Sequence, residues 1–198
     1  MNSRVSRRLA THVGSPTPFG VLFVCTGNIA RSASSELIAR HRCESSPQLE
    51  FASAGTAAVV GSPVAPEMGA ELERRGVPFD GHRGQQLVGD MVRHADIVLV
   101  METHHRQWIL DEWPGAVGTT FLLKHAAREL AAGFDPASAP VDPAAWLRTY
   151  SSKAQPDDGI SDPFRKGDAA ARVAMTEIEA ALNQLLPVVE QWVSLTRN

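Results

Sequence analysis

The chain has 198 residues, enough for one domain with a substantial core and too few for two comfortable ones. Hydrophobic residues make up 43% of it, as in an ordinary soluble globular protein, and the formal net charge is -3. Such a charge provides no broad basic surface, which argues against nucleic acid as a partner.

The N-terminal residues are polar and basic, with Arg4, Arg7 and Arg8 before Pro16 and Pro18. They lack the uninterrupted apolar run of a secretory signal, and no later segment is long and apolar enough to cross a membrane. We therefore expect a flexible leader over residues 1–18 and one domain over residues 19–198.

Cysteine usage points to a reducing compartment. Cys25 and Cys43 make no disulfide framework, and no paired CxxC is present to hold zinc. We expect a cytoplasmic protein with a thiol free for chemistry.

Short apolar runs alternate with amphipathic segments along the chain. Residues 20–24 (GVLFV) predict a strand buried on both faces, and a helix that ends near residues 41–43 follows the turn CTGN. Further strands are expected at 49–53, 96–101 and 119–123, and further helices at 66–75, 103–112 (with Thr103 as N-cap) and 124–132. This alternation predicts an α/β fold, a single three-layer domain with a four-stranded parallel sheet flanked by helices.

The last third of the chain has a different pattern. Residues 133–158 are rich in Pro, Asp, Ala and Ser, which predicts a long loop or lid with one short helix. A final helix is expected from about Asp168, with apolar residues between Ile178 and Trp192 on one face. Pro187 should kink or break this helix.

The segment CTGNIARS, residues 25–32, has the features of a phosphate-binding loop after the first strand. Ligands of parallel α/β sheets gather at the carboxyl ends of strands, where N–H groups of the turn and of the following helix can bind an anion. Cys25 would lie at the positive end of the helix, which favours a thiolate. Arg31, six residues on, can grip two oxygens of the same anion, and Ser32 can donate a hydrogen bond to the sulfur.

A simpler interpretation of Cys25 is a small buried hydrophobe, and a Cys and an Arg six residues apart also occur by chance. The pair brackets a Gly-Asn turn at a strand-to-helix junction, which favours the phosphate loop. Asp162 precedes Pro163, so it should lie on a loop, free to lean over a neighbouring site. Asp135 and Asp142 also precede prolines, so this dipeptide alone does not identify an acid.

Five ordered segments resemble the bacterial low-molecular-weight protein tyrosine phosphatase family. They are VCTGNIARS at 24–32, FASAGT at 51–56, GVPFDGHR at 76–83, ADIVLVMETHH at 95–105 and DDGISDPF at 157–164. The resemblance extends from residue 20 to about 195. It departs from the family at Ala30, where a second cysteine is usual, and at Val59, where Trp, Tyr or Leu is common.

The resemblance implies a role for each matching residue. Cys25 would be the nucleophile, Arg31 the phosphate binder and Asp162 the general acid. The other loop residues would surround the phosphate: Thr26, Gly27, Asn28, Ile29, Ala30 and Ser32. Ser53 and His82, together with Asn28 and Ser32, would brace the loop by hydrogen bonds.

The implied substrate is a phosphotyrosine protein or peptide, cleaved through a cysteinyl-phosphate to release inorganic phosphate. We expect no cofactor, no metal, no nucleic acid, no membrane, and a monomer or weak dimer. His104 and His105 are adjacent on the predicted helix, so we expect that they do not face one metal site.

Three alternatives stay open. A single-cysteine arsenate reductase served by a small thiol could use the same loop. A protein-arginine phosphatase ranks lower, because that branch tends to have Thr where this chain has Ile29. A catalytically inactive phosphate-binding module would require residues 133–158 to block the cleft.

Overall fold

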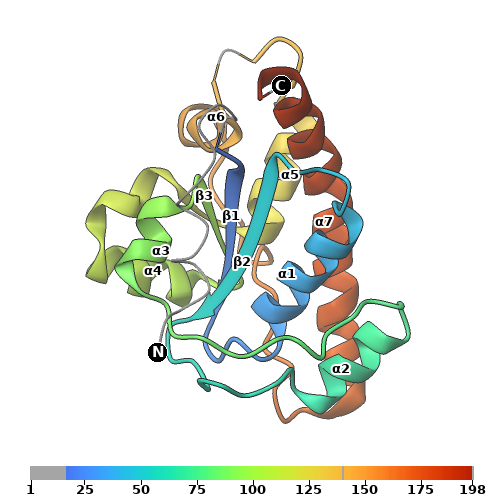
Figure 1. Ribbon diagram of the computed structural model, residues 1–198. Coiled ribbons are helices and arrows are strands. Elements are labelled where there is room, and N and C mark those ends of the chain that lie inside the picture. The colour runs from blue at the N-terminus through green and yellow to red at the C-terminus, as the bar shows by residue number, and fades with distance from the viewer. Residues whose placement is uncertain (1–16, 140, 198) are drawn as a thin grey trace.

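The computed structural model describes residues 17–139 and 141–197. Its centre is a four-stranded parallel sheet in the order β2-β1-β3-β4 (Figure 1). The strands are β1 (Phe19–Cys25), β2 (Leu49–Gly55), β3 (Ile97–Val100) and β4 (Thr120–Leu122). The predicted four-stranded parallel sheet is confirmed. The division into a leader, residues 1–18, and a domain, residues 19–198, stays a prediction, because residues 1–16 lie outside the described part.

Helices cover both faces of the sheet, which confirms the three-layer arrangement (Figure 1). One layer holds α1 (Arg31–Arg42), α2 (Pro66–Glu73), α5 (Leu123–Gly133) and α7 (Gly167–Thr196). The other holds α3 (Gly89–His94), α4 (Thr103–Glu112) and the 3-10 turn η2 (Pro114–Gly118). The predicted long loop, residues 133–158, contains one short helix, α6 (Pro143–Tyr150).

Side chains of β1 point alternately to the two faces of the sheet, and each face has its own hydrophobic core. Phe23 and Cys25 pack into the larger core with α1, α5 and α7, whereas Leu22 and Val24 pack into the smaller core under α3 and α4. Because successive side chains of a strand point to opposite faces, a strand buried on both faces is apolar throughout.

The prediction of where α4 begins is wrong. The N-cap of α4 is Glu102, not Thr103: the Glu102 side chain accepts from the His105 N–H, and the His105 ring accepts from the Glu102 N–H. Of the kink or break expected at Pro187, the structure excludes the break: α7 continues through Pro187 to Thr196. Leu186 and Val189 beside Pro187 are buried, and such packing offsets the roughly 3 kcal/mol that an interior proline costs.

Some elements also begin or end at residues other than those predicted, and α3 was not predicted at all. β2 runs two residues further than expected, to Gly55, and α2 ends earlier, at Glu73. Within the described ranges, no helix is long and apolar enough to cross a bilayer.

Candidate active site at the carboxyl end of the sheet

The loop between β1 and α1 is held by its carbonyl oxygens. Those of Cys25, Thr26 and Gly27 accept hydrogen bonds from the N–H groups of Thr56, Ala57 and Val59, in that order, at 2.9 to 3.0 Å. The Ile29 carbonyl accepts from the Ala65 N–H at 2.7 Å. These bonds orient the carbonyl groups toward the segment that follows β2. The N–H groups of the loop are therefore the backbone groups left to bind an anion at the start of α1.

Asn28 organises the inside of this loop. Its backbone is left-handed, with φ 54°, a conformation that Asn tolerates better than most residues. The fully buried side-chain amide donates to Ser32 Oγ at 3.0 Å and to Ser53 Oγ at 2.8 Å. His82 Nε2 donates to the Asn28 carbonyl at 2.7 Å. The residues expected to brace the loop therefore lie together in one hydrogen-bonded cluster.

Two further residues extend this cluster. The Gln85 N–H donates to Asn28 Oδ1 at 2.9 Å, and Ser53 Oγ donates to the Glu36 carboxyl at 2.6 Å. Burial raises the pKa of Glu36, and the Ser53 hydrogen bond partly offsets that effect. Neither Gln85 nor Glu36 was predicted: Gln85 reaches the loop from the segment before α3, and Glu36, on α1, contacts Ser53.

Cys25, the predicted nucleophile, is the last residue of β1 and is almost fully buried. Its Sγ lies 2.9 Å from Ser32 Oγ. A hydroxyl at this distance can donate to a thiolate and stabilise its charge.

Arg31 lies under the loop with only 1% of its surface exposed. Its Nη1 donates to the Glu102 carboxylate and, at 2.8 Å, to the Ile160 carbonyl, and its Nη2 lies 3.1 Å from Asp162 Oδ1. The fold thus brings Asp162 to the same guanidinium, as expected. The buried Nε has no hydrogen-bond partner among residues 17–139 and 141–197.

Glu102 is the main site residue that the sequence analysis missed. β3 pairs with β1 so that Val100 lies opposite Val24, and the chain beyond β3 therefore emerges beside the phosphate loop. The Glu102 carboxylate caps α4 and accepts from Arg31. An acidic residue just past the carboxyl end of a predicted buried strand was the available signal.

His104 and His105 lie on one side of α4, which was not expected of adjacent residues on a helix. The rings of His104 and His105 have centroids 3.9 Å apart, and with Glu102 they place one possible metal-ligand atom each within 4.8 Å of one another. Both nitrogens of His105 are engaged, however: Nδ1 by the Glu102 N–H at 3.1 Å and Nε2 by Thr26 Oγ1 at 2.9 Å. The positive charge of Arg31 on Glu102 further disfavours a cation there.

His105 should stay neutral over the physiological pH range. Burial, with the nearby His104 and Arg31, lowers the pKa of His105 from 6.5 to about 3. The neutral ring accepts at Nδ1, which makes Nε2–H the donor to Thr26 Oγ1. This histidine therefore anchors the second residue of the loop without carrying charge.

A pH dependence of stability follows from His105. The unfolded chain binds the proton near pH 6.5 and the folded chain only near 3, so lowering the pH through this window favours unfolding. Between pH 7 and 4 the wild type should lose roughly 3 kcal/mol more free energy of unfolding than His105→Gln. Urea denaturation of both proteins at the two pH values measures this, and parallel losses would contradict a neutral buried imidazole.

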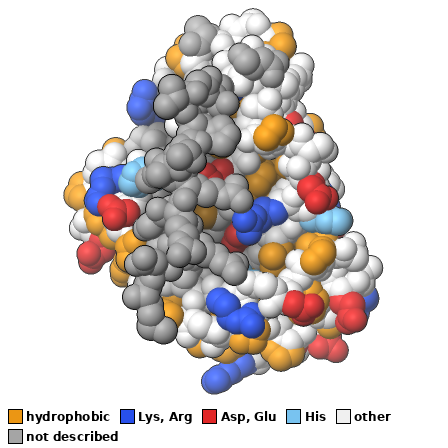
Figure 2. Space-filling view, viewed as in Figure 1, with side chains coloured by type: hydrophobic (Ala, Val, Ile, Leu, Met, Phe, Trp, Pro, Cys, Tyr) orange, Lys and Arg blue, Asp and Glu red, His pale blue; other side chains and the backbone are white. Residues whose placement is uncertain are grey.

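The rim of the site carries few aromatic side chains. Val59 is 44% exposed and Phe164 is 39% exposed. The Arg165 guanidinium lies 5.0 Å above the Phe164 ring. On the face shown in Figure 2, acidic and basic side chains are interspersed.

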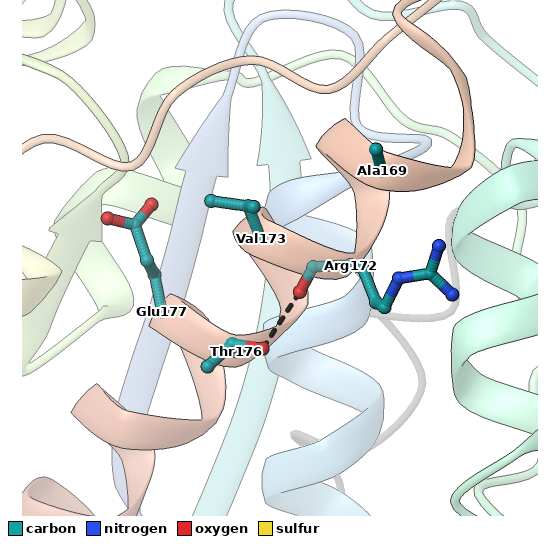
Figure 3. Close-up of a pocket in the computed structure, with 5 residues that line it drawn as sticks. All are labelled: Ala169, Arg172, Val173, Thr176 and Glu177. Atoms are coloured by element: carbon teal, nitrogen blue, oxygen red, sulfur yellow. Dashed lines mark hydrogen bonds between the residues drawn. The ribbon is translucent and has the colours of Figure 1, made fainter.

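A separate depression lies on α7 and does not belong to this site. It is lined by Ala169, Arg172, Val173, Thr176 and Glu177, all from one helix (Figure 3). Thr176 Oγ1 donates to the Arg172 carbonyl at 2.9 Å, so its hydroxyl is already used within the helix.

Comparison with known proteins agrees with this geometry. The sequence pattern of the low molecular weight phosphotyrosine protein phosphatase family matches residues 20–131. A putative low molecular weight protein-tyrosine-phosphatase of Klebsiella pneumoniae is 36% identical over 151 residues, 76% of this chain and 83% of that protein. The probable phosphatase EpsP of Ralstonia nicotianae is 29% identical over 177 residues, 89% and 95% of the two chains.

Solved structures show the same architecture. The YwlE arginine phosphatase from Geobacillus stearothermophilus superimposes with a TM-score of 0.70 at 25% identity, over 91% of this chain and 99% of that chain. With the parallel sheet, the loop after β1 and these matches taken together, the chain belongs to the low molecular weight phosphotyrosine protein phosphatase family, hydrolases of phosphoric monoesters.

Proposed function

We propose that the substrate is phosphotyrosine in a protein or peptide, and that Cys25, Arg31 and Asp162 carry the reaction. One observation carries this proposal above the others. The buried Arg31 holds three protein acceptors through its Nη atoms, while its Nε has no partner in the described part of the chain. A phosphate oxygen in the loop would supply the acceptor that a buried donor requires.

In the first step the Cys25 thiolate attacks phosphorus in line with the tyrosine oxygen. The S–P bond forms, the P–O bond breaks, and Asp162 gives its proton to the departing phenolate oxygen. The Ser32 hydroxyl, 2.9 Å from Sγ, lowers the energy of the attacking thiolate.

Charge spreads over the three equatorial oxygens in the transition state. The loop N–H groups and Arg31 stabilise it, and they need no rearrangement because the loop is already braced by Asn28. Glu102 and the Ile160 carbonyl both accept hydrogen bonds from Arg31 Nη1, which fixes the orientation of the guanidinium.

In the second step water attacks the cysteinyl-phosphate. Asp162, now a carboxylate, takes a proton from that water, the S–P bond breaks, and inorganic phosphate leaves while Cys25 returns to the thiolate. All atoms and protons balance with water as the only co-reactant.

The setting of this chemistry is also part of the proposal. A free thiol as nucleophile is compatible with the reducing cytoplasm, where we place the enzyme. We propose that it acts as a monomer or weak dimer on phosphorylated proteins and binds no nucleic acid, in keeping with the net charge of -3.

Phosphoarginine is the second candidate substrate. The likeness to an arginine phosphatase in overall structure favours it. Against it stands Ile29 in the loop, where the arginine-specific branch tends to have Thr. The sparse aromatic rim, with Val59 exposed, weakens the preference for a planar aromatic ring.

Arsenate reduction and phosphate binding without catalysis have less support. Cys43 ends α1, and a helix of 12 residues spans roughly 18 Å, so it is remote from Cys25. Burial and the nearby Glu190 raise the pKa of Cys43 to about 12, which makes it a poor nucleophile. An arsenate reductase would therefore need an external small thiol, and an inactive module would leave the Cys25–Ser32 contact without a purpose.

The test is a substrate panel with the full chain. We expect release of phosphate from a phosphotyrosine peptide at least about a hundredfold faster than from a matched phosphoserine peptide, because a phenolate leaves more readily than an alkoxide, and also faster than from a matched phosphoarginine peptide. Faster cleavage of phosphoarginine would make the chain a protein-arginine phosphatase. Binding without turnover of all three would favour the inactive module, and arsenate reduction with glutathione would favour the reductase.

A further inference from the structure

The segment that leads to Asp162 is tied to one face of α5. The Ser152 N–H and hydroxyl each donate to the Glu129 carboxylate at 2.8 Å. The Ser152 carbonyl accepts from His125 Nε2 at 3.0 Å. Lys124 Nζ, on the residue before His125, lies 3.4 Å from the Gly159 carbonyl. α5 therefore contacts this segment at several points before the chain reaches the phosphate loop.

Asp158 is the most buried of these attachments, with 2% of its surface exposed. Its two carboxylate oxygens accept from Arg128: Oδ1 from Nη1, and Oδ2 from Nη2 at 3.2 Å. The Gln155 N–H also donates to Oδ2, at 2.6 Å. Burial alone would raise the pKa of Asp158, but the hydrogen bonds from Arg128 and Gln155 hold it below its usual value. The pair is thus charged, bidentate and oriented.

Rigid contacts continue from Asp158 to the acid. Ile160, two residues on, is fully buried; its N–H donates to the Met101 carbonyl at 2.8 Å, and its carbonyl accepts from Arg31 at 2.8 Å. Asp162 follows after two more residues, with 42% of its side chain exposed and Oδ1 3.1 Å from Arg31. The position of the Asp162 carboxyl group relative to the phosphate loop therefore depends on the preceding backbone, which is held in place at Asp158 and at Ile160.

We propose that Arg128 and Asp158 form a positioning pair that sets where Asp162 stands over the phosphate loop. The inference rests on the proposed role of Asp162 as general acid. A proton donor on a loop is effective only when its support keeps it in place, and a misplacement of about 1 Å can cost roughly a hundredfold in rate. Neither residue of the pair touches the substrate.

A purely structural role for this ion pair predicts something different. Loss of this partly buried pair would then lower stability and reduce activity on every substrate alike. Loss of acid positioning instead matters only when the leaving group needs a proton. The leaving group therefore separates the two explanations.

The experiment compares phenyl phosphate with 2,4-dinitrophenyl phosphate, whose leaving anion departs without a proton. In Asp158→Asn and in Arg128→Gln we expect kcat/KM to fall about ten- to a hundredfold on phenyl phosphate and less than about threefold on the dinitrophenyl ester. In an Asp162→Asn background, adding Asp158→Asn should cost less than about threefold further, because the acid it positions is already absent.

Glu71→Gln is the matched control. Glu71 is another buried carboxylate held by two arginines, but it lies on α2, and its partners Arg74 and Arg75 directly follow that helix. We expect it to lower Tm to a similar degree while leaving the ratio of the two kcat/KM values unchanged. Equal losses on both esters in the Asp158 and Arg128 variants, or no loss, would overturn the proposal.

A readout independent of turnover accompanies the kinetics. Amide hydrogen exchange over residues 158–164 should be at least about tenfold faster in Asp158→Asn than in the wild type, and exchange over residues 66–73 should not change. Unchanged exchange over 158–164 would overturn the positioning role even if the enzyme were inactive. Inactivity of the wild type on both esters would instead reject the proposed function. Arg128→Gln keeps both measurements possible if Asp158→Asn does not fold.

Discussion

Cys25→Ser should lower kcat/KM on a phosphotyrosine peptide by about five to six orders of magnitude, the size of loss typical when a covalent nucleophile is removed. A serine hydroxyl keeps the size of the thiol and the contact with Ser32 Oγ, but it is not ionised at neutral pH. The phosphate should still bind, because the loop N–H groups and Arg31 are untouched. The variant should therefore retain its affinity for inorganic phosphate as an inhibitor while losing turnover.

Cys43→Ser provides the same substitution at the other cysteine. Cys43 is buried at the end of α1, and burial raises its pKa to about 12, so its thiol takes no part in the chemistry. We expect kcat/KM within about twofold of the wild type. Steady-state kinetics of both variants, with Tm as a check on folding, decide the matter. A Cys25→Ser enzyme with more than about a thousandth of normal activity would contradict a thiolate nucleophile.

The second large effect is expected for Arg31→Lys, about a thousandfold lower kcat/KM on the same peptide. Arg31 binds Glu102, the Ile160 carbonyl and Asp162 through its Nη atoms, and its Nε has no partner in the described part of the chain. A lysine ammonium is a single point charge, and it cannot bond these acceptors and a phosphate in one plane. The loss should appear in both kcat and the affinity for phosphate.

Arg93→Lys is the control for this conservative change. Arg93 forms an exposed ion pair with Asp90 on α3, away from the loop, and exposed pairs contribute little. Its kinetics should match those of the wild type. A loss of less than about tenfold for Arg31→Lys, with Tm unchanged, would mean that the guanidinium does not bind the transferring phosphate.

Local sequence was sufficient to predict the loop and its surroundings. The loop is formed by consecutive elements: the strand at 20–24, the Gly-Asn turn and the helix that follows. Cys25, Arg31 and Ser32 therefore lie close together around this single loop. The alternation of buried strands with helices was sufficient for the parallel sheet, because such crossovers are short and of one hand. The resemblance added Ser53, His82 and Asp162, which no local pattern brings to Cys25.

Tertiary structure alone decided the partners that hold these residues. Glu102 reaches Arg31 because β3 lies beside β1, and a strand order cannot be derived from the pattern of any one strand. His104 and His105 share one side of α4 because His105 turns back to cap it. Arg128 meets Asp158 across 30 residues that include α6. The sequence by itself predicted which groups would react, since Cys25, Arg31 and Ser32 lie at short spacing and the resemblance supplied Asp162. The tertiary structure decided how these side chains are oriented, because their orientation depends on contacts between segments distant in the chain.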